Sequence, residues 1–514
     1  MKEPYHPGKF ENRWLLEGTL TTVTPFHLGS GHVIPRKGLT EPLSQEVSVK
    51  AVFRDVAGLP CIPGSSLKGV LRARLVGALG EQDDAVLNLF GKPEVEGRKS
   101  PIQTGHAGRA EFHESRAPEQ TLPASQMPPP FWKQWPDAML TGLNANVAIR
   151  RRTRTAAHQK LFHTEFVPPG IQFKVRITAQ NLDGPHMASL LWALEQFDDP
   201  NRPLHLGADG GNDWGRFHWA VSPIRKMTKK DMAQWLNPTP ANTGLAQGLR
   251  AALPAVGYKA LESLLPFALA SSLPVAASNG SDSITLRLKL RFDGPFLVKR
   301  PAPPKARGGT APNAEPYLDA FGRVVLPASA FRGVFRAQVE RILRTLAPDE
   351  TTALAWAPDP TEKAIEDTSS QGISALSPIA KVFGATGWKS PVELSDFTCA
   401  KASPPPVFNH ELVAIDRFTG GAAEGAKFKF RVAWCPVFTG TITLRRDRWR
   451  AVGVDDWACG LCALALRDLR EGDLVFGLGS GKGYGACAKA EFDWFPDAAK
   501  LAKHFQECVR KNSL

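Results

Sequence analysis

The stretch "CIPGSSLKGVLRARL" (residues 61–75) occurs a second time in the chain, as "VLPASAFRGVFRAQV" (residues 325–339). A proline, a cation, a glycine and an arginine recur in it at identical spacing. In both copies a short apolar pair precedes the proline, and apolar residues at helical spacing follow it, which predicts a strand that leads into a helix. Serine is a preferred N-cap residue, so the expected caps of the two helices are Ser65 or Ser66, and Ser329.

Two further segments repeat in the same order. "VAIRRRTRTAAHQKLF" (residues 147–162) matches "VAIDRFTGGAAEGAKF" (residues 413–428), and "LHLGADGGNDWGRF" (residues 204–217) matches "LVFGLGSGKGYGAC" (residues 474–487). The order holds across both halves, so the chain is a tandem duplication of a unit of about 220 residues, the size of one domain. The expected division is a first unit over residues 1–224, a connector with some helix over 225–282, and a second unit over 283–514.

Each unit shows the same alternation of strands and helices. "WLLEGTLTTV" (residues 14–23) and "ITLRLKLRF" (residues 284–292) predict opening strands. A second helix is predicted in each unit, over residues 186–197 and 456–469, shortly before the glycine-rich segment. Strand, helix, strands, helix and strand is the ferredoxin-like order, so the predicted fold class is α+β, with an antiparallel sheet covered by helices in each unit.

The composition describes a soluble and basic chain. The chain has 63 Lys and Arg residues and 50 Asp and Glu residues, which gives a net charge of +13. A field of this sign favours polyanionic partners such as nucleic acid, although a basic surface kept for solubility is the alternative. The sequence shows no apolar run of membrane-spanning length and no secretion signal, and its seven cysteines are irregularly spaced. The cytoplasm, without a membrane partner, is the expected location.

The helix that follows each proline carries two cations one turn apart. These are Lys68 and Arg72 in the first unit, and Arg332 and Arg336 in the second. Backbone N–H groups at a helix start, together with two cations, favour a contact with a phosphate backbone. The alternative is a capped helix with two solvated cations.

The segment "IRRRTRT" (residues 149–155) places four arginines beside two threonines, on an expected loop or strand end. Arginine matches the geometry of phosphate and hydroxyls add neutral phosphate contacts, so this segment predicts a nucleic-acid contact. The residues expected to make the contact are Arg150, Arg151, Arg152 and Thr153, and in the second unit Arg417 and Thr419.

The glycine-rich segments resemble a phosphate-binding loop but lack its chemistry. Phe476 stands in place of the first glycine of that motif, and Gly483 in place of the hydroxyl that holds magnesium. We therefore expect phosphate contacts without hydrolysis, or a glycine-rich bend that only packs on the helices. The candidate contact residues are Gly211, Arg216, Gly481 and Lys482. Cys459 and Cys462 lie in a predicted helix without a second pair, which favours a core position over a zinc site.

Taken in order, "IPGSSLKG", the I-x-R-x-T segment and the C-terminal glycine segment resemble the RAMP superfamily of CRISPR-associated proteins. The likeness is to the Cas-seven group, the backbone subunits of type III effector complexes, and the duplication resembles the fused subunits of type III-D variants. The resemblance implies ferredoxin-like, RNA-recognition-like units with inserted loops, each with a thumb hairpin placed between guide and target RNA. Implied partners are guide RNA, target RNA and other type III subunits, with sequence specificity left to base pairing.

Members of this family that cut target RNA use an acid in the loop after the first strand, so the resemblance leaves enzymatic activity open here. The candidate acids are Glu46 and Asp55 in the first unit, with Glu41 farther out, and Glu315 and Asp319 in the second. Such cleavage would use Mg²⁺ or Mn²⁺, and no tightly bound cofactor is expected. Asp55 and Asp319 have an alternative role as turn aspartates.

Other RAMP proteins process precursor RNA with a histidine, which defines the rival function: a stand-alone, metal-independent endoribonuclease acting on precursor CRISPR RNA. His27 or His32 would be the general base, since histidine titrates near neutral pH. The second unit has no histidine at the corresponding place.

Overall fold

The structure is a computed structural model. It describes residues 10–37, 46–92, 105–117, 141–151, 153, 155–200, 202–231, 255–257, 260–261, 263–266, 269, 282–299, 312–319, 321–359, 368 and 372–511. Of the residues singled out in the sequence, Glu41 and Arg152 lie outside this part of the chain.

The first unit is built on an antiparallel sheet with the opening strand β1 (Asn12–Thr22) at its centre. On one side β1 pairs with β11 (Gln172–Gln180), and on the other with β12 (Phe217–Val221) and β13 (Ile224–Thr228). Beyond these come the short strands β7 (Ala110–Phe112), β8 (Ser115–Arg116), β4 (Cys61–Ile62) and β14 (Ala255–Val256). Strand β12, which follows the second helix, lies beside β1, as the last strand does in a ferredoxin-like sheet. Residues 225–228 and 255–256, expected in the connector, lie in this sheet.

The second unit repeats this arrangement around β15 (Ile284–Phe292). Strand β15 lies between β22 (Val437–Leu444) and β23 (Cys487–Glu491), again antiparallel to both. The outer strands are β18 (Val392–Leu394), β19 (Phe397–Cys399) and β17 (Val325–Leu326). Two sheets with the same strand order confirm the predicted α+β, ferredoxin-like class for both units.

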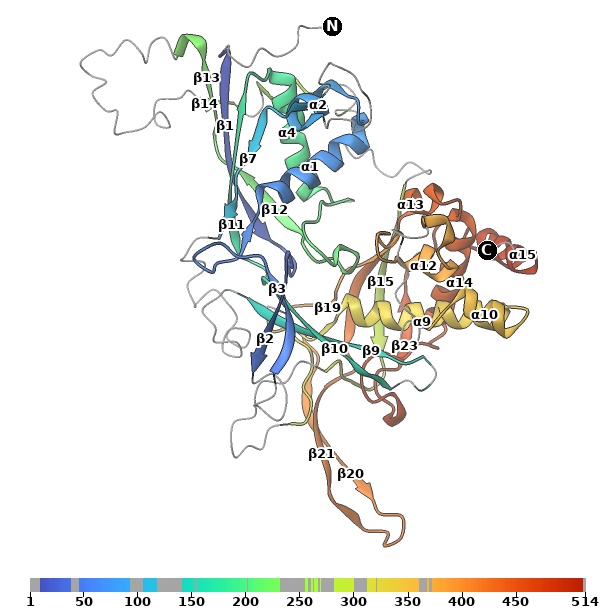
Figure 1. Ribbon diagram of the computed structural model, residues 1–514. Coiled ribbons are helices and arrows are strands. Elements are labelled where there is room, and N and C mark those ends of the chain that lie inside the picture. Colours follow the sequence, from blue (N-terminus) through green and yellow to red (C-terminus); the bar gives the residue numbers. More distant parts are fainter. Residues whose placement is uncertain are drawn as a thin grey trace.

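Helices cover one face of each sheet (Figure 1). In the first unit they are α1 (Gly64–Leu79), α2 (Asp84–Phe90) and α4 (Gly184–Glu195). In the second they are α9 (Ala328–Leu346), α10 (Glu350–Trp356), α12 (Pro378–Phe383), α13 (Arg446–Ala451), α14 (Asp455–Arg470) and α15 (Ala498–Arg510). Helices α4 and α14 confirm the second predicted helix of each unit. No helix in the described part of the chain is long and apolar enough to span a membrane.

The predicted serine caps are wrong. Helices α1 and α9 start one residue after their prolines, Pro63 and Pro327 being the N-cap residues, and neither start has a side-chain cap. Ser65, Ser66 and Ser329 therefore lie inside the first turn. Proline fixes φ near the value that a helix start needs, so the helix begins earlier than the serines suggested.

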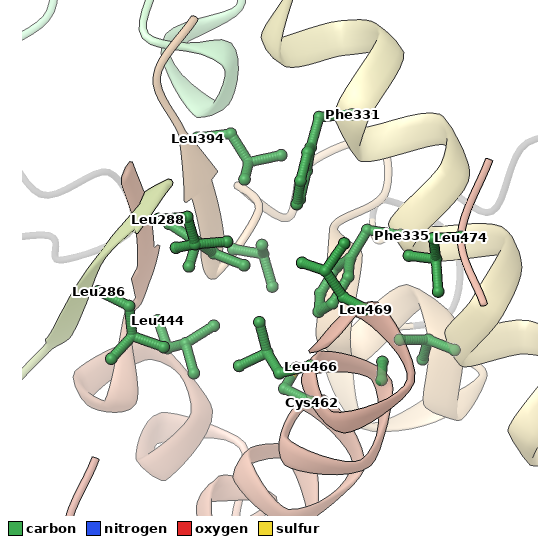
Figure 2. Close-up of a cluster of buried hydrophobic side chains, with 14 of the residues drawn as sticks. Leu286, Leu288, Phe331, Phe335, Leu394, Leu444, Cys462, Leu466, Leu469 and Leu474 are labelled. Atoms are coloured by element: carbon green, nitrogen blue, oxygen red, sulfur yellow. The ribbon is translucent and has the colours of Figure 1, made fainter. Parts of the chain in front are cut away.

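The core of the second unit forms between its sheet and helices α9 and α14 (Figure 2). Phe331 of α9 stacks on Phe397 with ring centroids 4.6 Å apart, and Leu466 of α14 is fully buried. Cys459 and Cys462 are buried in the same core, which confirms their predicted core position. Burial of this apolar surface is the main favourable contribution to folding of the unit.

Each unit also carries a long β-hairpin. The first hairpin consists of β9 (Gly142–Ile149) and β10 (Ala156–Phe166), and joins β2 (Gly29–Lys37) and β3 (Glu46–Val52) in a separate sheet. The second hairpin consists of β20 (Val407–Ile415) and β21 (Ala422–Trp434), beside β16 (Pro295–Phe296). A two-stranded ladder of β5 (Gly91–Lys92) and β6 (His106–Ala107) completes the strands. Figure 1 shows the second hairpin projecting from the body of the molecule, while the first passes close to α9.

Candidate nucleic-acid interface

The arginine-rich segment forms the turn of the first hairpin, between Ile149 and Ala156. The backbone N–H of Arg150 donates to the carbonyl of Thr155 over 2.9 Å, and the hydroxyls of Thr153 and Thr155 lie 2.7 Å apart. Arg150 is exposed, and its guanidinium has no acidic partner among the described residues. The predicted loop position is confirmed, with an exposed cation and a hydroxyl at the tip.

The turn of the second hairpin has the same length and a different chemistry. The Asp416 carboxylate accepts the backbone N–H groups of Phe418 (2.7 Å) and Thr419 (3.2 Å), which fixes the turn. Arg417 and Thr419 are exposed, and the Phe418 side chain is 99% exposed. A fully exposed aromatic ring between an arginine and a threonine is suited to stacking on a base. Phe418 was not among the predicted contact residues, although an aromatic residue between the arginine and the threonine of "DRFTG" is evident in the sequence.

The two faces of the second hairpin differ sharply. In the register of β20 and β21, Asn409 pairs with Arg431, Glu411 with Lys429, and Val413 with Lys427, which puts the three cations on one face. Lys427 forms an ion pair with Glu411 at 2.7 Å. The opposite face is apolar and includes Phe408, Leu412, Phe428 and Phe430. The alternation in "KFKFRV" signals this basic stripe, which the sequence analysis did not use.

The glycine segments are bends that pack behind the hairpins. A Cβ on Gly215 or Gly485 would collide with the carbonyl of the residue opposite, and both have positive φ. The Tyr484 hydroxyl lies 2.6 Å from His410 Nδ1 of the second hairpin, and its ring is buried. Trp214, the corresponding residue of the first unit, packs on Phe166 of the first hairpin with centroids 5.5 Å apart. The alternative prediction was a bend that packs on the helices; in both units the bend instead contacts the hairpin through this aromatic residue.

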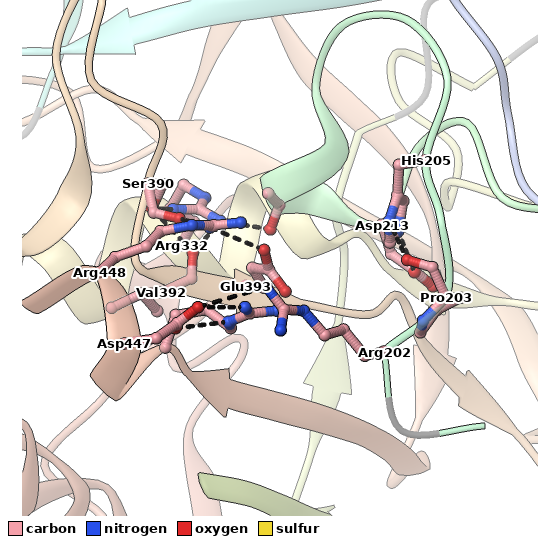
Figure 3. Close-up of polar contacts among 12 residues, drawn as sticks. Arg202, Pro203, His205, Asp213, Arg332, Ser390, Val392, Glu393, Asp447 and Arg448 are labelled. Carbon is pink, nitrogen blue, oxygen red and sulfur yellow. Dashed lines mark hydrogen bonds and ion pairs between the residues drawn. The ribbon is translucent and has the colours of Figure 1, made fainter. Parts of the chain in front are cut away.

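Two residues predicted to contact RNA instead contact each other across the units. The glycine segment of the first unit contains a 3-10 turn, η2 (Gly210–Asn212), which lies against α9. Arg332 of α9 donates to Asn212 Oδ1 (2.6 Å), to the Gly211 carbonyl, to Ser390 Oγ (2.9 Å) and to the Val392 carbonyl (2.8 Å). Figure 3 shows Arg332 beside Ser390 and Val392. Burial lowers its pKa to about 10. The guanidinium of Arg332 therefore joins the two units, and its buried position does not support the predicted contact with a phosphate.

The buried carboxylate of Glu340 binds two more of the cations that were predicted to contact RNA. Glu340 of α9 accepts Arg151 Nε at 2.6 Å from the first hairpin turn, and Arg336 Nε at 2.8 Å from its own helix. Arg202 of the first unit also lies 3.4 Å from Asp447 of the second. Glu340 was not predicted, because a single acid in an amphipathic helix indicates a surface residue.

The remaining predicted cations stay closer to solvent. Lys68 is half-buried on α1, and Arg72 forms a largely exposed ion pair with Glu81 at 2.9 Å. Arg216 lies 3.4 Å from Asp213. Gly481 and Lys482 are exposed, in the 3-10 turn η6 (Ser480–Lys482) of the second unit.

Among the candidate acids whose side chains the structure describes, Asp55, Glu315 and Asp319, none belongs to a cluster of acids. The Asp55 carboxylate accepts the backbone N–H groups of Ala57 and Leu59, and Asp319 accepts those of Phe321 and Arg323. Both are turn aspartates, as the alternative stated. Glu315 lies 4.0 Å from Arg431 beside the second hairpin, and Glu46 begins β3. Asp468, Glu471 and Asp473, which come together in the described part of the chain, are not among the predicted acids.

The two candidate histidines have opposite environments. His27 is 6% exposed, its Nδ1 lies 2.6 Å from the Glu165 carbonyl, and burial lowers its pKa. His32 lies on β2 and is exposed. A general base must reach the 2′-hydroxyl that it deprotonates, and the burial of His27 opposes this.

The chain was also compared with known proteins. The family model described as the RAMP superfamily matches it twice, over residues 19–218 and 202–488. The first match covers most of the first sheet and the first hairpin. The second begins at residue 202, within the first unit, and covers most of the second sheet and the second hairpin, so the family model recurs as the fold does. The search of curated proteins found no match to the chain.

Proposed function

Because the chain belongs to the RAMP superfamily, whose proteins bind RNA and work in CRISPR complexes, we propose that it is a backbone subunit of an RNA-guided type III effector complex. In this role it holds the guide RNA by its phosphates and accommodates the guide–target duplex in antiviral defence. The base pairs supply the sequence specificity. Its partners are then guide RNA, target RNA and the other subunits of the complex.

The observation that supports this proposal is the pair of hairpin tips. Both are turns of equal length at corresponding places, and each exposes an arginine and a threonine: Arg150 with Thr153, and Arg417 with Thr419. Arginine and hydroxyl side chains contact phosphates without reading the bases. The exposed Phe418 adds an aromatic surface on which a base of the duplex can stack.

We assign no cleavage chemistry to Asp55 or Asp319, since each carboxylate holds its own turn. Cleavage of target RNA with Mg²⁺ or Mn²⁺ would fall to Glu46, at the start of β3, and to Glu315, beside the second hairpin. The rival function, processing of precursor RNA, would rest on His32, because His27 is buried.

The test compares two double variants of equal charge. Arg150→Ala with Arg417→Ala removes the cations at both tips, and Lys500→Ala with Lys503→Ala removes two exposed cations on α15. Binding of single-stranded repeat RNA is measured over a range of salt concentrations. Losing two phosphate contacts should reduce the slope of log K against log[salt] by about 1.4, since each contact to a single strand contributes about 0.7.

The control variant should keep the wild-type slope. Equal slopes for both variants would remove the hairpin tips from the RNA surface. Incubation of the same RNA without metal addresses the rival function: discrete cuts that His32→Ala abolishes would favour the stand-alone ribonuclease.

A further inference from the structure

The contact between the two units joins unlike surfaces. The first unit contributes its glycine turn η2 and the tip of its hairpin, through Gly211 and Arg151. The second unit contributes one face of α9, through Arg332 and Glu340. We call the first surface the donor surface and the second the α9 face. Such a head-to-tail contact leaves one surface of each kind unpaired at the ends of the molecule.

The second unit carries its own donor surface, and it is open. Its turn η6 is flanked by left-handed residues, Gly479 and Gly483, as η2 is flanked by Asp209 and Asp213. Every residue of η6 is exposed, and a Cβ on Gly481 would meet no atom within 4 Å, whereas η2 is half-buried against α9. The same backbone shape is thus covered in one unit and exposed in the other.

The first unit carries the surface that corresponds to the α9 face, on α1, but its side chains differ. By the repeat, Lys68 takes the place of Arg332, and Val76 takes the place of Glu340. The carboxylate that holds Arg151 in the internal contact has no counterpart on α1. Arg417, which corresponds to Arg151, would find an apolar residue there.

The donor surface has changed as well. Lys482 stands where Asn212 accepts the hydrogen bond of Arg332 in the internal contact. If a second copy docked head-to-tail, Lys482 would therefore lie opposite Lys68. Two ammonium groups brought together at a desolvated contact cost several kcal/mol. The chain is thus mismatched to itself at its ends.

We propose that the open donor surface of the second unit, centred on the exposed turn η6, binds a different protein. That partner presents a helix face with a carboxylate opposite Lys482 and with a donor for the Gly481 carbonyl. A protein fits better than a nucleic acid, because the corresponding surface of the first unit contacts a helix, whose Arg332 donates to the Gly211 carbonyl. The proposal rests on the internal contact and holds independently of RNA binding.

A charge-swap cycle tests this pairing with the chain itself as the probe. Wild type, Lys68→Glu, Lys482→Glu and the double variant are compared by sedimentation velocity over a concentration series without RNA. Both lysines lie outside the core, and thermal melting checks that each variant folds. Each single variant creates an opposite-charge pair and should self-associate with a Kd at least about tenfold lower than wild type. Wild type and the double variant should remain monomeric.

A second pair of substitutions keeps the proposal testable if the charge-swap variants fail to fold. Lys68→Arg with Lys482→Asn copies the internal contact of Arg332 with Asn212 and should also promote association. Self-association of the wild type that Lys482→Glu changes would identify a second copy as the natural occupant and overturn the proposal. The proposal would also be overturned by a cycle in which no folded variant self-associates, or by one in which Lys482→Glu weakens RNA binding and leaves self-association unchanged.

Discussion

Replacing Glu340 with alanine should detach the first hairpin turn from α9 and destabilise the folded chain. Glu340 is fully buried and accepts Arg151 at 2.6 Å and Arg336 at 2.8 Å. Removing one partner of a buried ion pair costs about 3–5 kcal/mol, because the remaining charge is left desolvated. The two arginine side chains are 16% and 25% exposed, so water can reach them after the change. We therefore expect a loss of about 2–3 kcal/mol in the free energy of unfolding, below the cost for a fully desolvated pair.

The reciprocal change should cost less. Arg151→Ala leaves Glu340 paired with Arg336, so the expected loss is about 1 kcal/mol, that of one hydrogen bond between charged groups at a partly exposed site. Glu340→Gln keeps the shape and one carbonyl acceptor, and should lie between the two. The predicted order of destabilisation is therefore Glu340→Ala, then Glu340→Gln, then Arg151→Ala.

Urea unfolding measures these differences, followed by tryptophan fluorescence and by circular dichroism so that coincident transitions verify two-state behaviour. Hydrogen exchange of the turn between β9 and β10 reports its attachment to α9, and should speed up in Glu340→Ala. The double variant of Glu340 and Arg151 closes the cycle and gives their coupling energy. If Arg151→Ala destabilises as much as Glu340→Ala, or if exchange in the turn is unchanged, the shared carboxylate does not hold the two units together.

Three further changes have definite expectations. Burial raises the pKa of Asp396 to about 7, so the neutral form of this carboxyl is favoured in the folded state, and its contribution to stability is present below pH 4 and is lost as the pH rises through about 7. Asp396→Asn should therefore remove up to about 4 kcal/mol of the difference in unfolding free energy between pH 4 and pH 8. Phe418→Ala should leave the melting temperature unchanged and weaken RNA binding about tenfold, a loss within the 1–3 kcal/mol of one stacked base, whereas Val56→Ala, at another fully exposed apolar residue, should change neither. Tyr484→Phe removes the hydroxyl bonded to His410 and should cost about 1 kcal/mol in urea unfolding; an unchanged midpoint would count against that bond.

The repeat made the fold predictable from the sequence. Its strands and helices follow from local apolar spacing, and β1, β15, α4 and α14 lie where that spacing placed them. The predicted first residues of α1 and α9 were wrong, because the prediction relied on serine caps, whereas both helices begin directly after a proline. The sequence also predicted that the arginine-rich segment lies on a loop or strand end, because a charged cluster between two apolar stretches indicates an exposed connection.

The sequence by itself determined that two similar ferredoxin-like units lie in one basic chain, and that cations gather in the arginine-rich loop and at the start of the first helix of each unit. Only the tertiary structure decided which of those cations face solvent. Arg150 and Arg417 remain exposed, while Arg151 and Arg332 contact the neighbouring unit. The physical reason is that strand and helix periodicity depends on neighbours along the chain, whereas the partner of a charged side chain depends on which surfaces meet in space.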